Sequence, residues 1–186
     1  MNELFQLYMQ LADALKEQQR ELERNFPEGC WSTLDYYETE DLGCIKGRIS
    51  AFLRAMELIE DLVGKVFINF SNHPSDKWSD AQRYDAENHG EIIDVPFPEV
   101  PADPHLNLDQ LARESVDRIF EAAGDKIPVV LVQGEMTLVY SVVSSLKKKG
   151  ITCLAAISDR KVEEKTEPDG TTKKVVTFEF KGFRSY

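Results

Sequence analysis

Polar side chains follow three short apolar runs of the sequence, and their types are those that bind or transform an anionic ligand. The groups are Ser71-Asn72-His73, then Gln133-Gly134-Glu135 with Thr137, and finally Ser158-Asp159-Arg160. Each group comes directly after a run that we interpret as a β-strand. Because the carboxyl ends of parallel strands meet at one edge of a sheet, we expect the three groups to converge there.

His73 and Arg160 bring the most specific chemistry to this predicted edge. An imidazole changes its protonation near neutral pH, which suits proton transfer or a phosphate contact. The guanidinium of Arg160 is planar and can donate two parallel hydrogen bonds to a phosphodiester. Structural alternatives remain open for both residues. Residues 72–74 also fit a simple turn, and Arg160 also fits a surface ion pair with Asp159 or Glu163.

Gly134 and Glu135 stand where the third strand is expected to turn into a helix. Gly134 would let a ligand approach the backbone, and the helix N-terminus would offer free N–H groups to an anion. Glu135 disfavours a phosphate at that point, so we expect it to bind a hydroxyl or a base edge, or to pair with Arg160. The structural alternative is that Gly134 only relieves steric strain at the turn.

Familiar catalytic and cofactor motifs are absent from the sequence. It contains no GxGxxG, GxxxxGK[ST], HExxH or GxSxG, so the dinucleotide, P-loop, zincin and esterase classes lack their signatures. The three cysteines, Cys30, Cys44 and Cys153, are widely spaced and form no CxxC pair, which indicates reduced thiols rather than a zinc site or disulfides. We therefore predict neither a metal nor a cofactor.

Charge and hydropathy limit the classes of partner. The net charge of −11 disfavours general nucleic-acid binding, which needs a basic face. Residues 147–186 are the exception, with 10 basic and 6 acidic side chains. The apolar runs are far shorter than the roughly 20 residues that cross a bilayer. We therefore expect a cytoplasmic protein without a membrane partner.

An α/β fold is predicted from residue 65 onward. Expected strands alternate with expected helices: strands at 66–70, 92–95, 129–132 and 151–157, helices at 79–90, 108–123 and 137–149, and a closing hairpin with its turn at Asp169-Gly170 and its last strand at 175–180. This alternation predicts a Rossmann-like, mostly parallel sheet with flanking helices over residues 65–186. The continuous apolar character of residues 129–132 favours a central strand.

A helical hairpin is predicted for residues 1–64. Apolar residues recur at three- and four-residue steps in residues 2–25 and again in a second helix, which Asp41 can cap and Gly64 ends. Two amphipathic helices cannot bury their stripes alone, so they must pair, pack on the α/β domain or dimerise. The two stripes therefore also motivate a prediction of self-association.

A set of motifs in the α/β region resembles a known group of proteins. The segments are residues 69–75 with Trp78, residues 94–98, residues 133–135 with Tyr140, residues 156–160 and residues 183–186. Together they resemble small CRISPR-associated Rossmann-fold proteins related to the CARF class, over about residues 65–186. The N-terminal helices have no counterpart in this resemblance.

The resemblance implies a role in antiviral defence, through binding of cyclic oligoadenylate messengers and, in some members, their cleavage. The ligand would lie across a pocket formed by the strand ends of both subunits of a homodimer. Such a ring nuclease is a metal-independent phosphodiesterase in which the substrate's own 2′-hydroxyl attacks the adjacent phosphate. Ser71 and His73 are then the expected catalytic residues. The expected ligand-binding residues are Asn72, Gln133, Gly134, Glu135, Thr137, Ser158 and Arg160.

Two other interpretations fit the same sequence. The α/β domain would be a non-catalytic module that binds another nucleotide or a small anion. Alternatively, the helical hairpin would dock a protein partner, with the α/β domain as its scaffold. Whether the chain is an enzyme is left open by the residues themselves.

Overall fold

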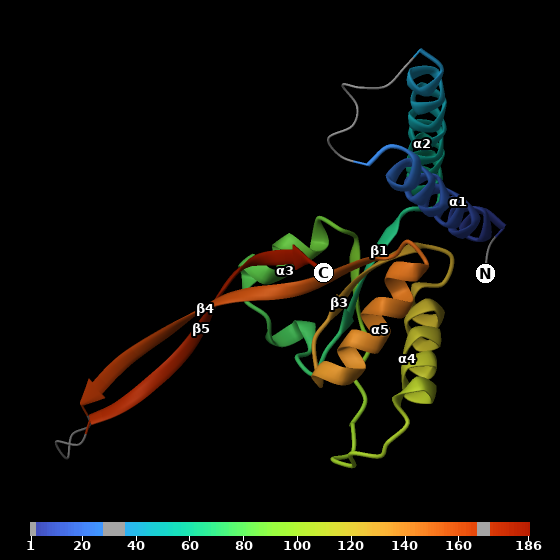
Figure 1. Ribbon diagram of the computed structural model, residues 1–186. Coiled ribbons are helices and arrows are strands. Elements are labelled where there is room, and N and C mark those ends of the chain that lie inside the picture. The colour runs from blue at the N-terminus through green and yellow to red at the C-terminus, as the bar shows by residue number, and fades with distance from the viewer. Residues whose placement is uncertain (1–2, 28–35, 167–171) are drawn as a thin grey trace.

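The computed structural model describes residues 3–27, 36–166 and 172–186 (Figure 1). In these residues the α-helices and strands follow one another in the order α1 (Glu3–Asn25), α2 (Tyr36–Val63), β1 (Lys65–Phe70), α3 (Asp80–Glu87), β2 (Glu91–Asp94), α4 (Leu108–Ala123), β3 (Ile127–Val132), α5 (Met136–Lys148), β4 (Thr152–Thr166) and β5 (Thr172–Ser185). Within these ranges no helix has the length and apolar character that a membrane span requires.

The five strands form one sheet in the order β2-β1-β3-β4-β5. The β2–β1, β1–β3 and β3–β4 pairs are parallel, and β5 runs antiparallel to β4. Every residue of β3 is buried, as befits the strand at the centre of the sheet. The prediction of an α/β, mostly parallel sheet preceded by helices is therefore confirmed. The chain leaves β1 toward β2 and then returns to β3, so the strand order reverses between β1 and β3.

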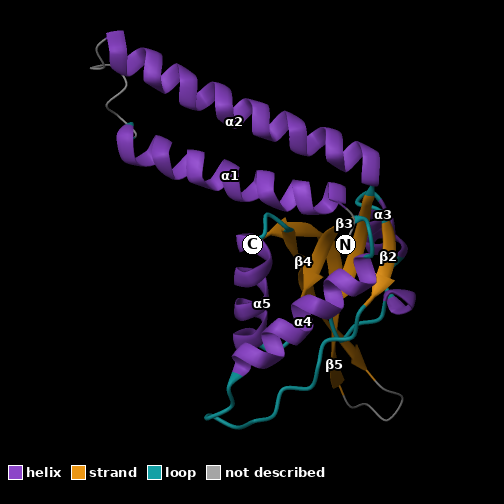
Figure 2. Ribbon diagram, turned by 90° about the vertical axis from the view of Figure 1, so that its right-hand side faces the viewer, coloured by secondary structure: helices purple, strands orange, loops and turns teal. Residues whose placement is uncertain are grey.

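Different helices cover the two faces of the sheet (Figure 2). On one face α4 and α5 pack on the strands, with Ile119, Leu138 and Leu146 fully buried. On the other face a smaller core surrounds Phe67 and Trp78 beside α3. The sequence Ser79-Asp80-Ala81-Gln82 has the pattern of a capping box and predicts the start of α3 correctly, since the hydroxyl of Ser79 accepts a hydrogen bond from the Gln82 N–H at 3.2 Å.

The N-terminal helices form the predicted hairpin, and α1 also packs on the α/β region. Phe5, Tyr8 and Ala12 are at most 4% exposed and belong to the same core as α4 and α5. The Tyr8 hydroxyl donates a hydrogen bond to Glu60 in α2 at 2.9 Å. Pairing and packing thus satisfy these apolar stripes within one chain. Because these stripes are buried within one chain, they no longer require self-association.

The start of α2 differs from the prediction. The helix already includes Tyr36, so Asp41 lies inside it and does not cap its first turn. Glutamate is a good helix former, and Glu38 in the first turn also interacts favourably with the helix dipole. A polar stretch that looks like a loop by hydrophobicity is therefore helical from Tyr36 onward.

The end of β4 is the larger correction. We expected the strand to end near residue 157 and to present Ser158, Asp159 and Arg160 at its tip. Instead β4 continues to Thr166, paired with β5 out to the Thr166–Thr172 register, after a β-bulge between Ile157 and Ser158. The two strands supply each other's hydrogen bonds, so β4 can leave the sheet and project from the body as a ribbon (Figure 1). The predicted turn at Asp169-Gly170 lies outside the described residues.

Candidate functional site

An open cleft of about 1160 Å³ lies at the carboxyl edge of the sheet, on the side covered by α3. Three parts of the fold line it: the segment after β1 up to the start of α3, the residue that follows β3, and the part of β4 and β5 where the ribbon leaves the sheet. The lining residues are Asn72, His73, Pro74, Lys77, Trp78, Ser79, Ala81, Gln82, Gln133, Ala156, Ser158, Lys161, Thr177, Phe178, Glu179 and Phe180. The β1 and β3 segments flank the point where the strand order reverses, where open α/β sheets bind their ligands.

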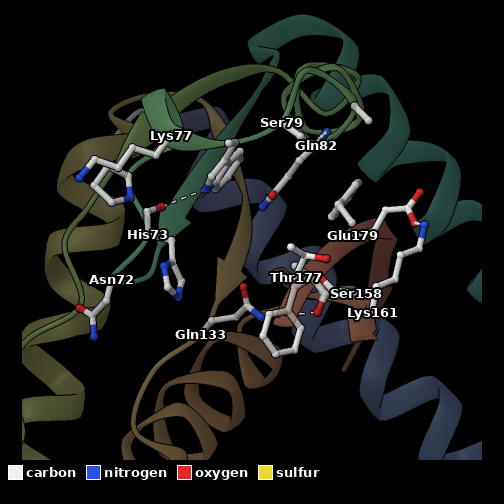
Figure 3. Close-up of a pocket in the computed structure, with 16 residues that line it drawn as sticks. Asn72, His73, Lys77, Ser79, Gln82, Gln133, Ser158, Lys161, Thr177 and Glu179 are labelled. Carbon is white, nitrogen blue, oxygen red and sulfur yellow. Dashed lines mark hydrogen bonds and ion pairs between the residues drawn. The ribbon is translucent and has the colours of Figure 1, made fainter. Parts of the chain in front are cut away.

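Asn72, His73 and Gln133 meet in this cleft, as the sequence predicted (Figure 3). The imidazole of His73 points into the space between the segment after β1 and the ribbon. The Gln133 side chain makes one long contact, from Nε2 to the Ala156 carbonyl at 3.5 Å. Ser158 also lines the cleft, although it lies inside β4 rather than at its end.

Ser71 does not lie with these residues. Its side chain is 5% exposed and is absent from the cleft lining. The hydroxyl donates to Asn69 Oδ1 at 2.7 Å and accepts the His73 N–H at 3.1 Å. The predicted catalytic serine therefore supports the loop, because a buried hydroxyl that already holds two partners cannot reach a ligand in the cleft.

The predicted anion site at the start of α5 is already occupied by the chain itself. Glu135 caps the helix: its carboxylate accepts the Thr137 N–H at 3.0 Å and the Leu138 N–H at 2.9 Å. The Thr137 hydroxyl donates to the same carboxylate at 2.7 Å. These bonds lower the pKa of the Glu135 carboxyl below its ordinary value, and the bond from the Thr137 hydroxyl contributes most. Two N–H groups of the first turn of α5 are thus already bonded to a carboxylate, which disfavours an anion at this helix N-terminus.

Gly134 is required by packing rather than by a ligand. A Cβ at this position would lie 2.5 Å from the ring of Phe97, which is 5% exposed and packs on Phe70. We expect Gly134→Ala to destabilise the protein by about 1–3 kcal/mol, the usual cost of overpacking a core. Urea unfolding would measure this loss. If the unfolding midpoint is unchanged and ligand binding is weakened, Gly134 is a ligand-binding residue instead.

Arg160 lies on the ribbon, outside the cleft. It is exposed and paired in register with Phe178 of β5, and it is not among the lining residues. The β4 extension changes this placement, because Arg160 lies within a paired strand and not at the strand tip that the sequence analysis expected. The structure therefore brings together Asn72, His73, Gln133 and Ser158, and separates them from Ser71, Gly134, Glu135, Thr137 and Arg160.

Several cleft residues were missed by the sequence analysis. Lys77 ends the 3₁₀ turn Ser75–Lys77, and its ammonium makes no ion pair or hydrogen bond among the described residues. On the ribbon, Phe178 lines the cleft with 70% of its surface exposed, and Lys161 forms an ion pair with Glu179. Lys77 could have been found from the sequence, because it is a basic residue only four positions after His73 in the segment that follows β1. The ribbon residues carried no such signal, because only the tertiary fold brings residues 177–180 to this edge.

Comparison with known proteins identifies a family for the α/β region. The model of the uncharacterized protein MJ1673 family matches residues 65–184, and the chain belongs to this family. It has no significant match among curated proteins or among solved structures.

Proposed function

We propose that this member of the MJ1673 family binds an oligonucleotide in the cleft, and that a cyclic oligoadenylate is its ligand. One observation carries the proposal: an unpaired ammonium and several unpaired polar side chains face an exposed aromatic ring across the cleft. The unpaired groups in the described chain are those of Asn72, His73, Lys77, Gln82, Ser158 and Thr177. The ring is that of Phe178.

Lys77 supports the binding of a phosphate. It lies on the His73 side of the cleft together with Asn72, opposite the ribbon (Figure 3). An ammonium without an acidic partner is available to a phosphate oxygen, and a carboxamide can donate to the same group. The second cation of the cleft, Lys161, is held by Glu179. The cleft therefore suits a ligand with dispersed phosphates rather than a compact triphosphate.

Phe178 supports the binding of a base. An exposed ring that lines a cleft provides a surface for base stacking, which contributes roughly 1–3 kcal/mol per base in single-strand binding sites. Carboxamides such as those of Gln82 and Gln133 can donate to and accept from a base edge. The volume of about 1160 Å³ lies above the usual range of roughly 300–1,000 Å³ for small-molecule sites, so more than one nucleotide fits.

Cleavage would follow from the ligand's own 2′-hydroxyl. Its oxygen attacks the adjacent phosphorus, the bond from phosphorus to the 5′-oxygen breaks, and a 2′,3′-cyclic phosphate and a 5′-hydroxyl result. The proton of the 2′-hydroxyl must leave and the 5′-oxygen must gain one. His73 is the lining residue of the type that exchanges protons near neutral pH, so we assign it this transfer.

A ligand panel tests the proposal. Isothermal calorimetry would compare cyclic tetra-adenylate, linear tetra-adenylate, AMP and inorganic phosphate, with chromatography of the same mixtures to detect cleavage. We expect the cyclic ligand to bind most tightly and phosphate alone to bind weakly. Equal affinity for phosphate and the nucleotides would favour the anion-binding module. Absence of binding throughout would favour docking of a partner on α2, where Leu53, Leu58 and Leu62 are 46%, 47% and 73% exposed.

The homodimer remains a prediction, and α5 offers a surface for it. Met136 and Tyr140 are 82% and 76% exposed, and a shallow groove beside them includes Gln133 of the cleft. Lys147 and Lys148 lie in the last turn of the same helix. An antiparallel pair of such helices would bury the apolar side chains in the middle and bring each Glu135 toward the lysines of the partner. Gln133, which lines both this groove and the cleft, would then connect the interface to the cleft.

We expect Tyr140→Glu to convert a dimer into a monomer, because two carboxylates would be buried at the centre of the interface. Light scattering coupled to gel filtration would measure the mass at tens of micromolar. Tyr84→Glu is the matched control, since Tyr84 is 70% exposed but lies on α3. A wild-type monomer, or equal behaviour of the two variants, would contradict this surface.

A further inference from the structure

We propose that Asn69 is a positioning residue for the cleft. Its side chain holds the loop after β1 in the binding conformation before any ligand arrives. The inference rests on the proposed function, because it concerns how the same cleft is organised. Asn69 is the second-last residue of β1 and is 1% exposed, and it does not line the cleft. It therefore has no direct route to a ligand.

The carboxamide of Asn69 joins three segments of the chain. Its Nδ2 donates to Asp94 Oδ1 at the end of β2 at 2.7 Å and to the His73 carbonyl at 2.9 Å. Its Oδ1 accepts the Ser71 hydroxyl at 2.7 Å. Both donors and the acceptor of one buried side chain are thus used, which fixes its orientation.

The neighbouring groups extend this network to the whole loop. Ser71 Oγ accepts the His73 N–H, and Asp94 accepts the Ser75 N–H at 3.1 Å and the Ser75 hydroxyl at 3.0 Å. The indole N–H of Trp78 donates to the His73 carbonyl at 3.0 Å. Residue 73 consequently has its carbonyl held inward by two side chains, while its imidazole points into the cleft (Figure 3).

This arrangement is a pre-organised loop rather than one that a ligand must order. The single side chain of Asn69 bonds three groups that hold the loop: the carbonyl of His73, the Ser71 hydroxyl that accepts the His73 N–H, and the Asp94 carboxylate that accepts the Ser75 N–H. Removing it should release the loop as a unit. The strand itself should persist, because its register with β2 and β3 is made by backbone hydrogen bonds.

Amide hydrogen exchange of the ligand-free protein, followed by NMR, tests the inference. In Asn69→Ala we expect protection of the His73 and Ser75 amides to fall by about 10-fold, while the amides of β3 keep theirs. Asn72→Ala is the matched control: the same residue type in the same loop, with an exposed side chain that bonds no described residue. It should leave the protection unchanged.

A second variant guards against a general loss of structure. Asn69→Asp places a carboxyl against Asp94, the titratable side chain bonded to position 69, since His73 contributes only its carbonyl. Two carboxylates this close share one proton more readily as the pH falls. Protection of the Ser75 amide should therefore be low at neutral pH and recover toward pH 5, which a merely structural defect would not do.

The outcomes separate this inference from the proposed function. Unchanged protection in Asn69→Ala, or equal losses throughout β3, would overturn the positioning role whatever ligand binds. Selective loss of protection would support it even if cyclic tetra-adenylate failed to bind the wild-type protein, and that failure would count against the proposed function alone. With a binding ligand, Asn69→Ala should weaken affinity for cyclic tetra-adenylate by about 10-fold through the released loop.

Discussion

Replacing Lys77 with alanine is expected to weaken the binding of cyclic tetra-adenylate by about 10- to 100-fold. The ammonium of Lys77 lines the cleft without a partner among the described residues, so a bound phosphate would be its first charged contact. Hydrogen bonds to charged groups contribute roughly 1.5–3 kcal/mol, which corresponds to this range of affinity. The melting temperature should hardly change, because the side chain is exposed and supports no core contact.

Arg160→Ala is the control for the Lys77 variant. The sequence alone favoured Arg160 as the phosphate ligand, whereas the structure places it on the ribbon outside the cleft. Both variants remove one exposed cation, so a general electrostatic effect of net charge would weaken binding equally. We expect less than about a twofold change for Arg160→Ala, measured by calorimetry at two salt concentrations. A larger loss for Arg160 than for Lys77 would show that the ribbon, not the cleft, carries the phosphate.

His73→Ala is expected to have the largest effect on turnover. If cyclic tetra-adenylate is cleaved, loss of a general acid or base should slow the single-turnover rate by about 10²–10⁴ while affinity falls far less. The imidazole points into the cleft, and no described residue bonds it. The backbone of residue 73 is held independently of its side chain, through its carbonyl and its N–H. The substitution should therefore leave the loop in place.

His73→Gln gives the matching comparison, because it keeps a polar side chain and removes the proton transfer. Chromatographic separation of cleaved and intact ligand under single-turnover conditions would give the rate for each variant. The cleavage rates of the wild type and of both variants should differ most at the pH at which the wild type is fastest. A similar loss of affinity and of rate in His73→Ala would instead make His73 a ligand-binding residue without a role in proton transfer.

The elements of the fold were largely predictable because each depends on local patterns. Residues 108–123 were predicted as a helix with the bounds that α4 has, because apolar residues recur at helical spacing and Gly124 stops the helix. The central strand was predictable from its continuous apolar run, and the start of α3 from its capping box. The start of α2 was not predictable in this way, because the residues of its first turn lack the apolar periodicity that indicates a helix.

The site was predictable only where a side chain directly follows a strand that ends at the sheet edge. Asn72, His73 and Gln133 meet this condition and line the cleft. Ser158 lines it for another reason, as part of the ribbon root. Glu135 and Gly134 lie outside the cleft lining, and the sequence did not predict the capping by Glu135 or the contact of position 134 with Phe97, because both depend on side-chain geometry that a sequence does not contain.

The sequence by itself thus determined the α/β class, the helical hairpin and two of the segments that meet at the functional edge. Hydrophobic periodicity and turn chemistry are local, and they need no knowledge of distant residues. The tertiary structure alone decided which polar groups are free and which are already bound. The ribbon of β4 and β5 removes Arg160 from the site and brings Phe178 into it, and buried Asn69 takes the Ser71 hydroxyl. These outcomes depend on contacts between segments far apart in the chain, where burial and partners are set by packing rather than by residue type.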